Sequence, residues 1–577
     1  MNIVTVPKMR ELHSLLLRLR TALVFVVMCL ALEVRVSSAT TDYAQAIQKI
    51  EAAVQAELSA GEISGVSIAL VDDQRIVCAR GFGLADKSKK LPARADTIYR
   101  CGSISKLFTA IATMQLVEQN KLNLDKPVTR YAPTFSIVDP FPDASPITLR
   151  QLLCHRSGLV REAPVGGYFD ASEAGVVETV LSLASCVLVY PPGAKTKYSN
   201  SGITLVGHAV SQLSGEPFVF YQQSHVLDPI GMTNSSFLLR KALKPRLAKG
   251  YLPVADGRGG FREIEAPHFE FGILPAGNLY TTVEDLGRFL SCLFARGRAG
   301  DTSILKPETL AEMFTPQFTG ETNGFGLGFN VSYFRGRKTV NHMGAVYGFT
   351  SLVTGMPEEK LGVVVLCNDD IAVGAVRKLG QLAYSVMVEA RFGETPPARP
   401  ARFKIAAGEL AVFAGEYESE SFWAEIKSGP DGLLANISGQ RMVLTPVGPQ
   451  QFEADGRLAR EAPVVFERNP GGTIKGFTAL NQQFRRVDPS REVPIPDAWW
   501  KFLGSYGPDF IPLIITVRHG HLYAMTENEY DNRLWPLNRF TFKMPPGIYT
   551  DEHIVFQPGA NGKIHSAVLA NMTLKRH

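Results

Sequence analysis

The chain has 577 residues, of which 45% are hydrophobic and 20% charged, a composition that excludes an intrinsically disordered chain. Its length predicts roughly two to four globular domains. The formal net charge is +5, but five basic and two acidic residues lie in the first 39, so nothing in the remaining balance favours nucleic acid or a strongly anionic partner.

The N-terminal segment has the pattern of a secretory signal peptide. Basic residues up to Arg20 precede the apolar run "TALVFVVMCLAL" (21–32), and the small residues "SSA" follow at 37–39. A run of 12 residues is too short to cross a bilayer comfortably. We therefore expect residues 1–39 to be a signal peptide and the protein to be exported, periplasmic or secreted, with no stable membrane span after cleavage. The alternative is a retained N-terminal membrane anchor.

Residues 40–392 read as one long mixed segment. Its apolar periodicity predicts helices over 43–58, 105–122, 147–158, 200–215 and 376–392. Short apolar runs predict strands over 65–71, 75–83, 324–331, 338–344, 348–356 and 360–368. Strands lie at both ends of this segment and helices lie between them. We therefore expect one α+β domain whose antiparallel sheet is completed by strands near the end of the segment.

The C-terminal part contains an internal repeat. Residues 393–405 are a Pro-rich linker. After it the sequence consists of short runs in which apolar and polar residues alternate, as in short β-strands. "FAGEY" (413–417) returns as "FLGSY" (502–506), and "LTPVGPQQF" (444–452) returns as "LWPLNRFTF" (534–542). We predict two antiparallel β-barrel-like modules, 406–487 and 498–577, joined by a linker at 488–497. One larger shared barrel is the alternative.

Seven cysteines are spread along the chain without any C-x-x-C pair. This spacing predicts neither a zinc site nor a disulfide-dense scaffold. The sequence is compatible with one disulfide, which it does not assign to a particular pair. No H-E-x-x-H, P-loop or G-x-G-x-x-G is present. We accordingly predict no metal and no cofactor.

One short stretch, "YRCGSISKLFTAI" (99–111), holds a candidate nucleophile. Ser103 and Lys106 are three residues apart at the start of a predicted helix, so their side chains share one helical face. A serine needs a neighbouring base, and no G-x-S-x-G elbow occurs in the chain. The competing interpretation is a helix cap beside a surface lysine.

Three motifs in order resemble the serine β-lactamase and penicillin-binding-protein superfamily, in the branch of class C β-lactamases, D-Ala-D-Ala carboxypeptidases and D-aminopeptidases. They are S-x-x-K (Ser103–Lys106), Y-x-N (Tyr198–Asn200) and H-x-G (His342–Gly344), within a resemblance that covers about 45–390. The resemblance implies a β-lactamase/transpeptidase-like fold and an acyl-enzyme on Ser103. Either Tyr198 as a phenolate or a neutral Lys106 would take the serine proton.

The resemblance also assigns binding roles. Asn200 would bind the substrate amide and help orient Lys106, and Gly344 would let the substrate lie close to its strand. The backbone N–H groups of Ser103 and Ala345 would form the oxyanion hole. His342 stands where class C β-lactamases carry lysine, which resembles peptidases and esterases more than antibiotic-hydrolysing enzymes.

These observations predict an exported serine hydrolase of small amides, peptides, including those with D-amino acids, or esters. A carboxylesterase or weak β-lactamase on the same site is one alternative. A non-catalytic penicillin- or peptide-binding protein that kept the fold is another. The expected partner is a small-molecule substrate rather than nucleic acid or a membrane.

Overall fold

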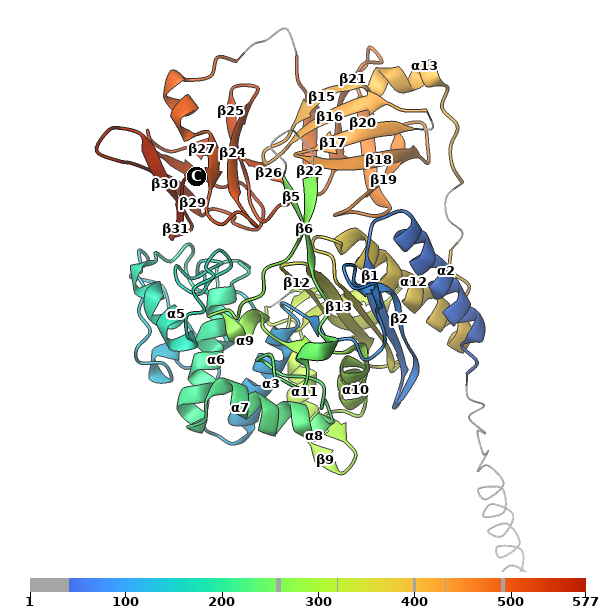
Figure 1. The fold of residues 1–577 in the computed structure, drawn as a ribbon, viewed down its shortest axis with the longest axis vertical. Helices are drawn as coiled ribbons and strands as arrows, with labels where there is room; N and C mark the ends of the chain where they lie inside the picture. The colour runs from blue at the N-terminus through green and yellow to red at the C-terminus, as the bar shows by residue number, and fades with distance from the viewer. Residues whose placement is uncertain (1–40, 256–260, 319, 398–400, 431, 489–492) are drawn as a thin grey trace, which may run out of the picture. The chain divides into compact units, whose positions relative to one another are not determined.

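A computed structural model describes residues 41–255, 261–318, 320–397, 401–430, 432–488 and 493–577 (Figure 1). The expected signal peptide, 1–39, lies outside the described residues. Residues Ala44–His577 make one compact unit. Within the described ranges, no helix has both the length and the apolar character that a membrane span requires.

An eight-stranded antiparallel sheet, in the order β10-β11-β12-β13-β14-β1-β2-β3, forms the centre of the first domain. β13 and β14 are buried along their whole length, because helices cover both faces of the sheet. The strands of this sheet are β1 (Gly65–Asp72), β2 (Arg75–Asp86), β3 (Leu91–Pro92), β10 (Gly324–Phe325), β11 (Asn330–Phe334), β12 (Arg337–Val346), β13 (Phe349–Met356) and β14 (Leu361–Cys367). Three two-stranded pairs accompany it: β4 (Tyr99–Arg100) with β7 (Tyr280–Thr281), β5 (Tyr251–Ala255) with β6 (Phe261–Glu265), and β8 (Arg298–Ala299) with β9 (Thr302–Ser303).

Helices pack on the sheet from two sides (Figure 1). The terminal helices of the domain, α2 (Ala44–Ser59) and α12 (Val373–Phe392), contact each other, and α12 packs on β13 and β14. α10 (Val283–Phe294) packs on β1 and β14. The shorter helices of the chain are α4 (Leu149–Leu153), α5 (Val176–Ser182), α7 (Phe218–Gln222), α8 (Asp228–Ile230), α9 (Leu274–Gly277), α11 (Pro307–Met313) and α13 (Ala407–Leu410).

Two long helices, α3 (Ser105–Glu118) and α6 (Asn200–Ser214), contact each other in the helical region. Both are apolar over most of their length, so α3 is buried almost all round. α6 ends at Gly215, as expected, because that residue takes the left-handed conformation of a C-cap (φ +77°). These two helices present the first two motifs.

Some expected boundaries are wrong. The helix expected over 147–158 ends at Leu153, since His155 adopts φ +57° and turns the chain. The helix expected over 105–122 ends at Glu118. The strand expected over 324–331 is divided between β10 and β11, where Gly328 (φ +83°) makes the turn.

The first C-terminal module is a closed eight-stranded barrel, as predicted. Phenylalanines, including Phe452, Phe466 and Phe477, fill its interior. Pairing of Tyr417 with Arg486 closes the barrel between its first and last strands. Its strands are β15 (Gly415–Glu418), β16 (Trp423–Ser428), β17 (Leu433–Ile437), β18 (Gln440–Pro446), β19 (Gln451–Gly456), β20 (Ala462–Arg468), β21 (Ile474–Ala479) and β22 (Gln482–Arg486).

The second copy differs from the closed barrel expected for it and forms a four-stranded and a five-stranded sheet. The reason is that the counterpart of β18 breaks at Leu534, between β26 and β27. The strands of the two copies lie in separate sheets, so the alternative of one shared barrel is wrong. The strands of this module are β23 (Gly504–Tyr506), β24 (Leu513–Arg518), β25 (His521–Met525), β26 (Asp531–Arg533), β27 (Trp535–Pro536), β28 (Thr541–Lys543), β29 (His553–Pro558), β30 (Ile564–Leu569) and β31 (Met572–Lys575).

Matching contacts confirm the internal repeat. The Tyr417 hydroxyl donates to the carbonyl of Phe413 at 2.7 Å, and Tyr506 donates to Phe502 at the same distance. The bridge between Tyr506 and Arg576 repeats the closing pair of the first copy. The six cysteines of the described residues are free thiols. None of them forms the single disulfide with which the sequence was compatible.

Candidate active site

Ser103 and Lys106 meet at the start of α3. Lys106 Nζ lies 2.9 Å from Ser103 Oγ and 2.7 Å from the carbonyl oxygen of Ala276. The Lys106 side chain is fully buried (0% exposed), and burial lowers its pKa well below the usual value. A buried amine that is neutral near pH 7 can accept the serine proton, so this pair is chemically competent for nucleophilic attack.

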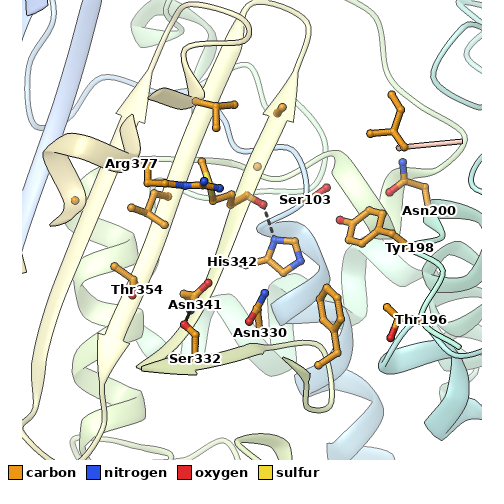
Figure 2. A pocket seen from close by; sticks show the side chains of 18 of the residues that line it. Ser103, Thr196, Tyr198, Asn200, Asn330, Ser332, Asn341, His342, Thr354 and Arg377 are labelled. Atoms are coloured by element: carbon orange, nitrogen blue, oxygen red, sulfur yellow. Dashed lines mark hydrogen bonds between the residues drawn. The ribbon is translucent and has the colours of Figure 1, made fainter. Parts of the chain in front are cut away.

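Tyr198 completes the group from the turn before α6. Its hydroxyl lies beside Ser103 (Figure 2), and Lys106 Nζ lies 4.9 Å from the centre of its ring. The sequence allowed Lys106 to lower the pKa of Tyr198 and make a phenolate. In the structure burial has the larger effect and raises that pKa, so the direction is opposite.

The ring of His155 packs against the ring of Tyr198. The two ring centres are 4.2 Å apart, and His155 Nδ1 accepts the backbone N–H of Ser199 at 3.2 Å. His155 itself is buried, and burial lowers its pKa well below the usual value. A neutral His155 therefore holds the tyrosine without adding a charge.

Strand β12 forms the opposite wall, where the neighbouring backbone leaves no space for a side chain at position 344. A Cβ on Gly344 would lie 1.9 Å from the carbonyl oxygen of Cys101, and Ser351 Oγ donates to that oxygen at 2.9 Å. This contact sets Ala345 against the turn that carries Ser103. Gly344 also lines the cavity, and its expected role toward the substrate stays a prediction.

His342 faces Tyr198 across the pocket, with 6.3 Å between the ring centres, and Ser103 lies between them (Figure 2). Its Nδ1 bonds the carbonyl oxygen of Met343, which only accepts, so Nδ1 carries the proton of the neutral ring. Nε2 is buried without a partner among the described residues. Burial lowers the pKa of His342 to about 4. The site therefore offers a neutral acceptor at this position near pH 7.

The depressed pKa of His342 predicts a stability difference that depends on pH. The folded state resists protonation of the ring, so its stability falls as the pH drops from 6.5 toward 4. Relative to His342→Gln, the wild type should lose about 3 kcal/mol between pH 7 and pH 4. Urea unfolding of both proteins at the two pH values measures this difference. Equal losses in the two proteins would show that His342 titrates as in water.

Asn200 begins α6 and is tied to a buried carboxylate. Its Nδ2 donates to Glu162 Oε1, and Glu162 lies 3.5 Å from Nε of Arg161. Burial raises the pKa of Glu162 to about 7. Lys106 Nζ bonds Ser103 and Ala276, and the expected help of Asn200 in orienting Lys106 stays a prediction.

Loops of the second C-terminal module also line the pocket, a cavity of about 760 Å³ that contains Ser103, Tyr198 and His342. Glu527 and Glu529 come from the turn after β25, and Thr550 comes from the loop after β28. Three ion pairs of the described residues join these loops to the first domain: Arg161 Nη2 with Glu527 (3.3 Å), Lys197 Nζ with Glu552 (2.6 Å) and Lys195 Nζ with Asp551 (3.2 Å). The C-terminal module is therefore part of this cavity.

Sequence reasoning missed Arg161, Glu162, Glu527 and Glu529. Arg161 and Glu162 directly follow the segment "LLCHRSGLV", where no motif marked them. A signal for the glutamates exists in the repeat: the first copy has a tight turn, Ser438–Gly439, where the second has "TENEY". A barrel needs only the tight turn, so the added acidic residues point to another role.

Comparison with known proteins identifies the family to which this domain is similar. The family model described as Beta-lactamase matches residues 48–384. Protein flp of Staphylococcus aureus (strain COL) is 24% identical over 321 residues, which are 56% of this chain and 63% of that protein. The chain thus spans less than two thirds of that relative. Putative beta-lactamase-like 1 of Homo sapiens is 26% identical over 415 residues, 68% of this chain and 77% of the relative.

Solved structures share the fold. The octameric penicillin-binding protein homologue from Pyrococcus abyssi has a TM-score of 0.54 at 24% identity and covers 76% of this chain and 99% of its own. EstCE1, a hydrolase with promiscuous acyltransferase activity, has a TM-score of 0.50 at 25% identity, over 59% and 98%. D-amino acid amidase from Ochrobactrum anthropi SV3 has a TM-score of 0.50 at 24% identity, over 60% and 100%.

Proposed function

The chain belongs to the Beta-lactamase family, and from that membership we propose that it is an exported serine hydrolase that forms an acyl-enzyme on Ser103. The observation that carries the proposal is the 2.9 Å contact of Ser103 Oγ with the buried Lys106 amine, in the cavity that Tyr198 also lines. Its substrates are small amides, peptides, including D-amino-acid peptides, or esters. Export rests on the sequence of residues 1–39 alone.

The proposed reaction follows from the protonation states. Lys106, whose pKa burial lowers well below its usual value, takes the proton of Ser103 as Oγ attacks the substrate carbonyl carbon. The backbone N–H groups of Ser103 and Ala345 stabilise the oxyanion. Tyr198, protonated because its pKa is raised, gives a proton to the leaving nitrogen or oxygen and is reprotonated by way of Lys106. Water then hydrolyses the ester on Ser103, which restores the hydroxyl.

Two observations bear on the substrate. A neutral His342 gives no cation for a substrate carboxylate, which favours uncharged amides and esters over penicillins. D-amino acid amidase shares the fold, and EstCE1 is named as a hydrolase with acyltransferase activity, so both amide and ester substrates are reasonable candidates. A carboxylesterase is the second candidate function for this reason.

A substrate panel tests the proposal. D-aminoacyl anilides, D-Ala-D-Ala peptides, nitrophenyl esters and nitrocefin should be offered to the wild type, with release of product followed by absorbance or mass. We expect turnover of anilides or esters to exceed that of nitrocefin. Nitrocefin as the best substrate by far would contradict the interpretation of His342. Binding of a penicillin without any turnover in the panel would support the non-catalytic alternative.

A further inference from the structure

A second cavity, of about 840 Å³, is lined by residues of both C-terminal modules. One wall is formed where the first barrel closes, with Glu418 on β15 paired to Arg485 on β22. The other wall carries Arg533 on β26 and Trp535 on β27. The volume is in the range of ligand pockets, and the cavity shares no lining residue with that of Ser103. It is therefore a candidate binding site separate from the proposed catalytic site.

Hydrogen bonds fix the two walls of this cavity to each other. The backbone N–H of Arg533 donates to the carbonyl of Ser421 at 2.8 Å, and Ser421 Oγ donates to the carbonyl of Pro546 at 3.1 Å. Trp535 Nε1 donates to the carbonyl of Glu420 at 3.3 Å. The indole is thus held by its edge, so the cavity is formed before any ligand arrives.

The lining of this cavity is polar, and its charges balance. Its apolar residues are Val487, Pro546 and Trp535, too few for a lipid-like ligand. Arg486 is engaged by the backbone, because its guanidinium donates to the carbonyls of Val412 (3.3 Å) and Ala414 (2.6 Å). The charged side chains that remain are two carboxylates and two guanidinium groups, those of Glu418, Glu420, Arg485 and Arg533. The cavity therefore favours neither an anion nor a cation.

The internal repeat shows that two amides in this lining are not needed for the fold. The segment "NQQFRR" (481–486) is the counterpart of "NMTLKR" (571–576), and both begin in the left-handed region, at φ +56° and +72°. Gln482 and Gln483 stand where the second copy has Met572 and Thr573. Within the described residues, no hydrogen bond engages either glutamine amide. Both amides are therefore available to a ligand.

The remaining groups match the two kinds of surface that a sugar ring offers. Amide, carboxylate and guanidinium groups each present two polar atoms side by side, which suits neighbouring hydroxyls that both donate and accept. Trp535 supplies a flat apolar surface for the C–H groups on the face of the ring. Arg533 lies over this indole, 4.3 Å from the ring centre, and no other ring or cation contacts it among the described residues.

We propose that the cavity between the two C-terminal modules binds an uncharged oligosaccharide, with the face of one sugar ring on Trp535 and hydroxyls on the amides of Gln482 and Gln483. Glu420 and Arg485 bind further hydroxyls at the rim. The site goes beyond the proposed hydrolase function and does not depend on Ser103, so either proposal can fail without the other.

Isothermal titration of the full-length protein tests the ligand class. Cellotetraose, maltotetraose and tetra-N-acetylchitotetraose are the uncharged probes, with tetragalacturonate as an acidic saccharide and tetraglycine as a peptide. We expect at least one uncharged tetrasaccharide to bind with a Kd of about 1 mM or lower. The proposal is overturned if none of the three binds, or if tetragalacturonate or tetraglycine binds more tightly than all of them.

The double variant Gln482→Met/Gln483→Thr tests the place of binding. It gives β22 the residues that the second copy carries at these positions, so the change is compatible with the strand. Loss of the two amides should weaken binding of the best tetrasaccharide by about tenfold. Urea unfolding should show the wild-type midpoint. An unchanged Kd in this variant would place the saccharide elsewhere and overturn the proposal.

Trp535→Ala tests the stacking surface, and Trp500→Ala is its matched control. Trp500 belongs to the same module, is 53% exposed and does not line the cavity. We expect Trp535→Ala to weaken binding about tenfold or more, Trp535→Phe to weaken it less, and Trp500→Ala to leave it unchanged. Equal losses in Trp535→Ala and Trp500→Ala would overturn the proposal. If Trp535→Ala does not fold, Trp535→Phe and the glutamine variant decide the outcome.

Discussion

Ser103→Ala is expected to remove covalent labelling by a fluorophosphonate and to lower kcat by about 10⁴ or more. Lys106 Nζ contacts Ser103 Oγ at 2.9 Å, so it has no substitute nucleophile to activate once that hydroxyl is gone. Intact mass after exposure to the reagent measures the adduct, and the rate on the best substrate of the panel measures the loss.

Ser105→Ala is the matched control, because the same motif carries a second serine two residues later. Ser105 Oγ donates to the carbonyl of Gly102 at 2.6 Å and accepts the N–H of Leu279 at 2.9 Å, so it is fully engaged in the fold. This variant should lose about 1 to 3 kcal/mol of stability and still be labelled. Labelling of Ser103→Ala at the wild-type extent would remove Ser103 from the mechanism.

The contacts that the sequence predicted are those that depend on local geometry. Ser103 and Lys106 lie one helical turn apart, so their proximity follows from the helix itself. The second and third motifs bring Tyr198 and His342 to the same cavity, Tyr198 from the turn before α6 and His342 from within β12. Buried apolar runs such as β13 and β14 were predictable for the same reason.

The contacts that the sequence did not predict depend on long-range packing. Arg161 and Glu527 are 366 positions apart in the chain, and no periodicity links them. The pKa directions of Lys106 and Tyr198 also follow from burial, which the motif does not contain. The break at Leu534 changes the second barrel although the repeat itself is preserved.

Arg161→Leu is expected to lower the free energy of unfolding by about 3 to 5 kcal/mol, because it leaves buried carboxylates without their cation. Arg161 lies 3.3 Å from Glu527 and 3.5 Å from Glu162, and its guanidinium faces the rings of Tyr198 and Tyr549. Urea unfolding at pH 7 measures the loss. Arg150→Leu is the control: its partly exposed pair with Asp125 should contribute about 0 to 1 kcal/mol.

The double variant Arg161→Leu/Glu527→Leu separates charge from packing. If the cost of Arg161→Leu comes from an unpaired buried carboxylate, removing Glu527 as well should recover about half of the lost stability or more. Glu162 would still lack its cation, so recovery should stay incomplete. A double variant less stable than Arg161→Leu would mean that the pair acts through shape rather than charge.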